Sequence, residues 1–174
     1  VLDGGVKAWE EAGQTLEQGW PRTAPTGLIE ARETVSLMSP SALKSRLEMP
    51  DTPLVVDLET SSDFMQGHIS GAVWIPRGWL ELRIKDSVSI GDTPIVLTCR
   101  NGEVSTLASA GLRDMGYTNV KVLEGGKLGW SAAGFVLETG PGSISVEPND
   151  VVIHPLGDKD RMEYYLTWEE ALGR

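Results

Sequence analysis

Cysteine is almost absent from this chain of 174 residues, in which Cys99 is the only one. A single cysteine excludes an internal disulfide, so the composition gives no sign of a small secreted fold held together by disulfides. Histidine is also scarce, since only His68 and His154 occur, and they lie far apart in the sequence. Neither a zinc-ligand cluster nor a cysteine–histidine catalytic pair is expected, and we predict no metal site.

Long apolar runs and an excess of positive charge are lacking as well. No apolar stretch is long enough to span a bilayer and no signal-peptide pattern opens the chain, so we expect a cytoplasmic protein. The formal net charge of -10 argues against nucleic acid or an anionic membrane surface as a partner, because both bind basic patches. A small anionic substrate is not excluded, because its binding depends on the local electrostatic field of the site rather than on the net charge of the chain.

The remaining composition is that of a globular protein, with 40% hydrophobic and 23% charged residues. Short apolar segments typical of strands alternate with amphipathic segments typical of helices. The expected strands cover residues 54–57, 71–75 and 94–97, and the expected helices cover 40–49, 61–66, 104–115 and 159–172. This alternation predicts an α/β sandwich with a mainly parallel sheet, in which ligands bind beyond the carboxyl ends of the strands.

Cys99 lies at the carboxyl end of one of these strands. A short polar loop follows it, and then a helix with an apolar stripe of Val104, Leu107, Ala108, Gly111, Leu112 and Met115. The first amides of a helix lack intrahelical partners and, together with the helix dipole, attract negative charge. A thiol held there should ionise readily and act as a nucleophile, with Arg100 as a neighbouring cation. The alternative is an inert buried cysteine, which the polar loop disfavours.

The loop reads Cys99-Arg100-Asn101-Gly102-Glu103-Val104-Ser105. It resembles the active loop of the rhodanese family, the thiosulfate sulfurtransferases, whose pattern is Cys-Arg-x-Gly-x-Arg-Ser. Other family landmarks agree in order and spacing, namely Asp57, the turn Gly67-His68-Ile69-Ser70-Gly71-Ala72, the pair Gly125-Gly126 and the segment 130–134. The resemblance covers roughly residues 37 to 138 and implies a three-layer sandwich with a mainly parallel five-stranded sheet flanked by helices.

In this family the cysteine accepts a sulfane sulfur, forms a persulfide and passes the sulfur to cyanide or a thiol. The resemblance therefore implies a double-displacement sulfurtransferase with Cys99 as the nucleophile and no cofactor. It also implies an anion cradle made by the amides of Arg100, Asn101, Gly102, Glu103, Val104 and Ser105, with the Ser105 hydroxyl as an added donor. Arg100 would orient the sulfur donor. Because there is no second cysteine, an external acceptor must discharge the persulfide.

Three positions depart from the family pattern. Val104 stands where an arginine often helps to bind anionic donors, Glu59 stands where arginine is common, and Ser70 replaces a proline. The first departure leaves open a catalytically weak binding or regulatory module, which an arginine introduced at position 104 would distinguish from an enzyme. A phosphatase or arsenate reductase is disfavoured, because it needs an arginine at position 105. Arg77 is a further candidate for anion binding, although an ordinary surface position or ion pair is the simpler role for it.

The opening of the chain repeats a later segment at an offset of 121 residues. Residues 1–19 align with 122–140 with ten identities, at Val1, Leu2, Gly4, Gly5, Trp9, Ala12, Gly13, Leu16, Glu17 and Gly19. We therefore expect residues 1–20 to be the C-terminal remnant of a preceding rhodanese-like module, with neighbouring modules of the same parent chain as partners. The expected order continues with a linker at 21–35, the rhodanese domain at 36–140 with its active loop at 99–105, and a linker and tail with a C-terminal helix at 141–174.

Overall fold

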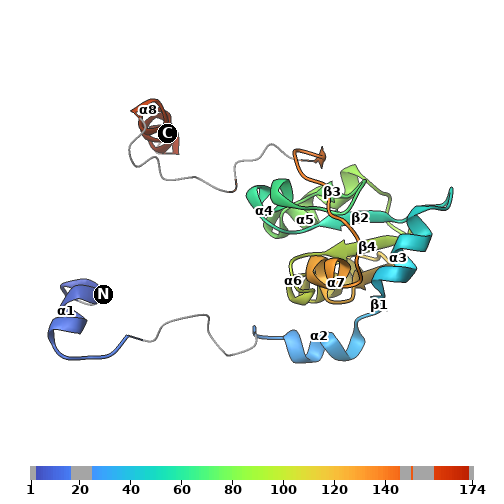
Figure 1. Cartoon of the computed structure of the whole chain (residues 1–174), viewed down its shortest axis with the longest axis horizontal. Helices are drawn as coiled ribbons and strands as arrows, with labels where there is room; N and C mark the ends of the chain where they lie inside the picture. The colour runs from blue at the N-terminus through green and yellow to red at the C-terminus, as the bar shows by residue number, and fades with distance from the viewer. Residues whose placement is uncertain (1–2, 17–24, 146–149, 151–158, 173–174) are drawn as a thin grey trace.

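The computed structural model of the chain describes residues 3–16, 25–145, 150 and 159–172 (Figure 1). Its strands are β1 (Leu37–Met38), β2 (Leu54–Asp57), β3 (Val73–Trp74), β4 (Ile95–Thr98), β5 (Val120–Leu123) and β6 (Ser143–Ile144). They form one sheet in the order β1-β5-β4-β2-β3-β6, and every pair is parallel. The carboxyl ends of all described strands therefore meet at one edge of the sheet.

Helices precede, follow and connect these strands (Figure 1). They are α1 (Gly5–Glu11), α2 (Leu28–Thr34), α3 (Pro40–Leu47), α4 (Ser61–Gln66), α5 (Leu80–Arg83), α6 (Glu103–Asp114), α7 (Gly126–Ala132) and α8 (Lys159–Leu172), with short 3-10 helices η1 (Arg77–Trp79) and η2 (Ile84–Asp86). The expected helix over 159–172 is confirmed. Among the described residues, no helix combines the length and the apolar character needed to cross a membrane.

The sheet is covered on both faces, and each face has its own core. Residues of α5 and α6, including Leu80 and Leu112, pack on one face together with Val56 and Leu97. Residues of α3, α4 and α7 pack on the other face, where Leu43, Phe64 and Trp130 meet Val55 and Val96. Neighbouring residues of one strand thus serve opposite cores, as expected for strands buried on both sides. The predicted three-layer sandwich is confirmed.

The sheet has six strands rather than the five that were expected. The additional strand, β6, comes from the predicted linker after residue 140 and pairs with the outer edge of β3, where Val73 lies opposite Ser143. The Ser145 amide extends this pairing by donating to the Trp74 carbonyl at 3.2 Å. A strand of two exposed residues has no alternating pattern, so the sequence could not reveal it.

The linker expected at 21–35 is also corrected in part. Residues 17–24 lie outside the described residues, but Leu28–Thr34 form helix α2. Leu28 is fully buried and Ala31 is nearly so, and the helix packs against α6. The Arg113 side chain of α6 donates to the Thr34 hydroxyl at 3.1 Å. With only seven residues and two buried positions, α2 is too short to show a helical period in the sequence.

Candidate active site

Strand β4 delivers Cys99 to the carboxyl edge of the sheet. All four residues of β4 are buried, and Cys99 directly after them has no solvent-exposed surface. Its side chain belongs to the core between the sheet and α6. Neighbouring strand β2 ends level with it, because Asp57 pairs with Thr98. The cysteine therefore lies at the base of the loop that joins β4 to α6, as the sequence predicts.

The carbonyl groups of this loop are held by the start of α7. The Lys127 amide donates to the Cys99 carbonyl at 2.8 Å, and the Leu128 amide donates to the Arg100 carbonyl at 2.9 Å. In a trans peptide the C=O and the following N–H point in opposite directions. The amides that follow these two carbonyls, those of Arg100 and Asn101, therefore point away from α7.

A glycine is required where the loop meets α7. Gly126 has a φ of +58°, and a Cβ atom at this position would lie only 2.2 Å from the Cys99 carbonyl oxygen. A side chain would thus push the loop away from the amides that hold it. The Gly125-Gly126 pair is in this sense a part of the site, because it allows the close approach that fixes the loop backbone.

Five of the six predicted cradle amides make no hydrogen bond with the described residues. Within the described chain no acceptor is found for the amides of Arg100, Asn101, Gly102, Val104 and Ser105. Helix α6 begins just after Gly102, so the last two are among its first amides, which have no intrahelical partner. The sixth, that of Glu103, differs from the prediction, because it donates to Asn101 Oδ1 at 3.1 Å.

The buried face of α6 is more polar than its apolar stripe suggests. Val104, expected on the buried stripe, is 38% exposed, whereas Ser105, Thr106 and Ser109 are buried. Thr106 and Ser109 can be buried because their hydroxyls donate to carbonyls one turn earlier, each at 2.8 Å. The Ser105 hydroxyl has no hydrogen-bond partner among the described residues. An unpartnered buried hydroxyl close to the free amides is consistent with the predicted role of Ser105 as a donor.

The loop is also tied to α2, an element that the sequence did not reveal. Arg32 of α2 lies 3.1 Å from one carboxylate oxygen of Glu103, and Asn101 Nδ2 donates to the other at 3.0 Å. The pairing with Arg32 offsets the negative charge that Glu103 places beside the free amides. Both side chains of the ion pair are partly exposed, so its main effect is on the local field rather than on stability.

The two arginines predicted to bind anions differ in their surroundings. The Arg100 side chain is exposed and makes no ion pair with any described residue, so it is available to a ligand at the mouth of the loop. Arg77 follows β3, and its Nη1 lies 2.8 Å from Glu81 Oε2 one turn later. Its guanidinium is therefore engaged in the ordinary ion pair that was the simpler alternative.

A buried ion pair lies next to the loop and was not recognised in the sequence. The Lys127 Nζ atom lies 3.2 Å from Asp57 Oδ2 and 3.4 Å from the Asp63 carbonyl, and both charged side chains are almost completely buried. Burial raises the pKa of the Asp57 carboxyl, while the neighbouring Lys127 and the Glu59 amide, which donates to Asp57 Oδ1, act to lower it. The local sequence Gly125-Gly126-Lys127 does not indicate that the lysine pairs with Asp57.

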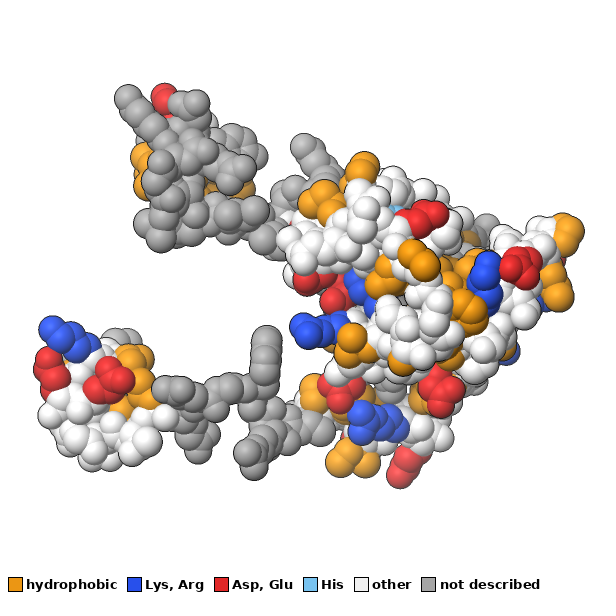
Figure 2. Space-filling view, viewed as in Figure 1, with side chains coloured by type: hydrophobic (Ala, Val, Ile, Leu, Met, Phe, Trp, Pro, Cys, Tyr) orange, Lys and Arg blue, Asp and Glu red, His pale blue; other side chains and the backbone are white. Residues whose placement is uncertain are grey.

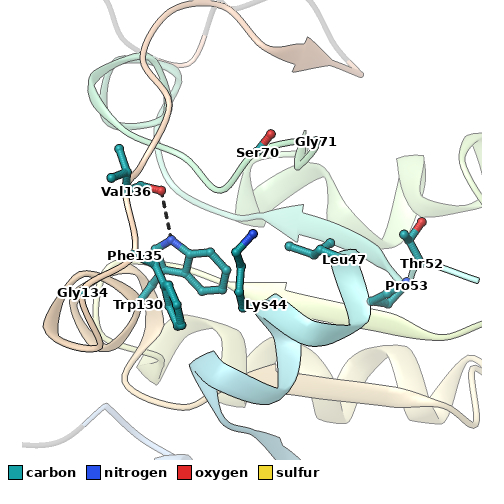
Figure 3. Close-up of a pocket in the computed structure, with 10 residues that line it drawn as sticks. All are labelled: Lys44, Leu47, Thr52, Pro53, Ser70, Gly71, Trp130, Gly134, Phe135 and Val136. Carbon is teal, nitrogen blue, oxygen red and sulfur yellow. Dashed lines mark hydrogen bonds between the residues drawn. The ribbon is translucent and has the colours of Figure 1, made fainter. Parts of the chain in front are cut away.

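One cavity on the described part of the domain borders the loop, and a larger one lies away from it. A cavity of about 310 Å³ is lined by Asn101, Gly102 and Glu103 together with Arg32 and residues of β5. A larger one of about 660 Å³ lies between α3 and the end of α7, where Lys44, Leu47, Trp130 and Phe135 line it, and it contains no loop residue (Figure 3). Among the described residues, no cluster of histidine, cysteine or carboxylate side chains could hold a metal ion.

Comparisons with known proteins find a family model and several sulfurtransferases that match this chain. The family model of the rhodanese-like domain matches residues 39–133. A sulfurtransferase of Allochromatium vinosum is 31% identical over 100 residues, which cover 58% of this chain and 92% of that protein. Thiosulfate sulfurtransferase GlpE of Ectopseudomonas mendocina is 34% identical over 90 residues, which cover 52% and 80% respectively.

A solved structure extends the likeness beyond the matched segment. The crystal structure of thiosulfate sulfurtransferase from Pseudomonas aeruginosa aligns with 91% of this chain at a TM-score of 0.67 and 26% identity. The aligned part is 29% of that longer protein. The family match contains the whole loop 99–105 but neither α1 nor α2, so Arg32 belongs to a part of the chain outside the matched domain.

Proposed function

Because the chain belongs to the rhodanese-like domain family, we propose that it is a sulfurtransferase in which Cys99 carries the transferred sulfur as a persulfide. The observation that supports this most directly is the geometry of the loop. Its carbonyls are bound by α7, and its amides are left without acceptors directly after the only cysteine. A persulfide at the end of this side chain would place a negatively charged sulfur where those amides can donate to it.

The reaction proceeds in two displacements. The Cys99 thiolate attacks the outer sulfur of a donor such as thiosulfate, a new S–S bond forms, and the S–S bond of thiosulfate breaks with sulfite leaving with the electron pair. An external nucleophile, cyanide or a thiolate, then attacks the outer sulfur of the persulfide and releases the Cys99 thiolate. Thiocyanate or a new persulfide is the second product, and no cofactor takes part. The loop amides stabilise negative charge on sulfur in both steps.

The small-molecule partners of this proposal are therefore a sulfur-donor anion and a thiol or cyanide acceptor. Arg100 is the cation placed to orient the donor, because its side chain is exposed beside the loop and makes no described ion pair. The Ser105 hydroxyl is the buried donor deeper in the site. Arg77 takes a secondary role, because a ligand would have to compete with Glu81 for its guanidinium.

Intact-protein mass spectrometry tests the proposal. After incubation with thiosulfate and removal of the excess, the chain is expected to have gained the mass of one sulfur atom, and cyanide should remove it with formation of thiocyanate. If neither thiosulfate nor an organic persulfide adds sulfur to the protein, the catalytic proposal is wrong, and the binding or regulatory module becomes the better account of the fold.

The exposed Val104 side chain gives a second prediction, which concerns the strength of donor binding. An arginine at this position would lie beside the free amides and could pair with an anionic donor, a contact worth about 1.5 kcal/mol or roughly tenfold in rate. Val104→Arg is therefore expected to raise kcat/KM for thiosulfate by about tenfold, and Val104→Gln is the uncharged control. Equal rates for the two variants would show that the charge at this position does not limit the reaction.

A further inference from the structure

The loop at residues 99–105 has no net positive charge of its own. Arg100 is its only basic residue, and Glu103 is its only acidic one, so one positive and one negative charge cancel. Val104 adds no charge at the position where the family pattern often has an arginine. The chain as a whole has a formal net charge of -10. An excess of positive charge at this loop must therefore come from another element.

Two ion pairs at the same edge of the sheet do not supply this charge. Lys127 pairs with Asp57, and Arg77 pairs with Glu81, so each cation is matched by a carboxylate. All four residues lie within 39–133, the segment that the family model matches. Neither pair adds net charge beside the loop.

Arg32 differs from these cations because it comes from α2, outside the matched segment, and pairs with the loop carboxylate itself. Its Nη2 atom lies 3.1 Å from Glu103 Oε1, and Asn101 Nδ2 donates to Oε2 at 3.0 Å. The carboxylate is thus held at both oxygens, and the three residues line the cavity of about 310 Å³ that borders the loop. In Figure 2, basic and acidic side chains lie next to one another on the surface around α2.

We propose that Arg32 is a positioning residue that sets the charge selectivity of the Cys99 site by cancelling and holding the Glu103 carboxylate. Arg32, Arg100 and Glu103 together carry one net positive charge, whereas the loop without Arg32 carries none. A carboxylate released by Arg32 would also be attracted to the first amides of α6, where it would compete with an anionic ligand. The inference rests on the proposed function, because the selectivity concerns the sulfur donor of that reaction.

The expected effect of removing Arg32 grows with the negative charge of the donor. The Coulomb energy is proportional to the ligand charge, so a screened unit charge that changes the binding of a monoanion about threefold changes that of a dianion about ninefold. Arg32→Met is therefore expected to lower kcat/KM about ninefold for thiosulfate, mainly through a higher KM. For the monoanion benzenethiosulfonate, which gives up its outer sulfur as benzenesulfinate leaves with the electron pair, the expected loss is about threefold.

Three further variants separate this role from a merely structural one. The double variant Arg32→Met/Glu103→Gln has the same net charge at the loop as the wild type, so it should recover the rates with both donors. Arg32→Lys keeps the cation and should lose little. Arg113→Met is the matched control, because Arg113 also joins α6 to α2, by donating to the Thr34 hydroxyl at 3.1 Å, but from the last turn of α6. Equal losses for the two donors, or the same losses in Arg113→Met, would show that Arg32 only secures α2 and would overturn the inference.

A second measurement requires no sulfur transfer. Cys99 is the only cysteine, so its rate of alkylation by iodoacetate, a monoanion, divided by its rate with uncharged iodoacetamide reports the electrostatic field at the sulfur atom. This ratio is expected to fall about threefold in Arg32→Met and to recover in the double variant. If sulfur transfer occurs but the ratio does not change, the inference is wrong and the proposed function is unaffected. If the ratio falls but no donor transfers sulfur, the proposed function is wrong and the charge selectivity of the site stands.

Discussion

The Cys99→Ala variant is expected to take up no sulfur from thiosulfate and to show no sulfur transfer to cyanide. The chain has no other cysteine, so no second thiol can replace the lost nucleophile. The loop amides would still bind an anion, but without the thiolate no S–S bond can form with the donor. This is the largest effect on activity that the structure predicts, and it is measured by intact mass and by thiocyanate formation.

The fold should survive this change. Cys99 packs in the core between the sheet and α6, and losing one buried sulfur atom there costs about 1 to 2 kcal/mol of unfolding free energy. The loop backbone is held through the Cys99 carbonyl rather than its side chain, because the Lys127 amide donates to that carbonyl. Cys99→Ser, which keeps a side chain of similar shape, is the control. Sulfur uptake by either variant would show that the acceptor atom lies elsewhere in the protein.

The sequence predicted the place of Cys99 in the fold better than the contacts around its loop. The position of Cys99 followed from a buried strand, a polar loop and a helix, and each has a strong local pattern. The free amides of the loop were largely predictable as well, because the position at which a helix begins decides which of its amides lack a partner. The Glu103 amide was an exception, because the sequence does not show that the Asn101 side chain would bind it.

Contacts between distant segments could not be predicted in this way. Arg32 reaches Glu103 across 71 positions, and Lys127 reaches Asp57 across 70, so neither pair has a local pattern. The apolar pattern of α6 predicts a buried Val104 because it depends on side-chain type alone, whereas the exposure of a side chain depends on what packs against its turn of the helix. The sequence predicts a linker where α2 lies, because the packing partner of this helix, α6, begins almost 70 residues later.

The Lys127→Met variant is expected to lose about 3 to 5 kcal/mol of unfolding free energy at pH 7, because it leaves the buried Asp57 carboxylate without its counter-charge. Methionine keeps much of the length and volume of lysine, so the loss of unfolding free energy measures the effect of the missing charge more than a change in packing. Asp57→Asn in the same chain should recover most of it, since the amide needs no cation. The matched control is Lys44→Met, because Lys44 forms an exposed pair with Glu48, and a change below about 0.5 kcal/mol is expected there.

The loss in Lys127→Met should depend on pH in a defined direction. Burial already raises the pKa of Asp57, and removing Lys127 takes away the main interaction that lowers it, so the pKa rises further in the variant. A folded-state pKa above the unfolded one means that the folded protein binds the proton more readily, so stability falls as the pH rises through this interval. The loss of unfolding free energy relative to the wild type is therefore largest at neutral pH. It shrinks toward pH ~4, where the Asp57 carboxyl of the unfolded chain also becomes protonated. Urea unfolding between these pH values measures it, and a deficit that is constant with pH would show that Lys127 stabilises the fold by packing rather than by its charge.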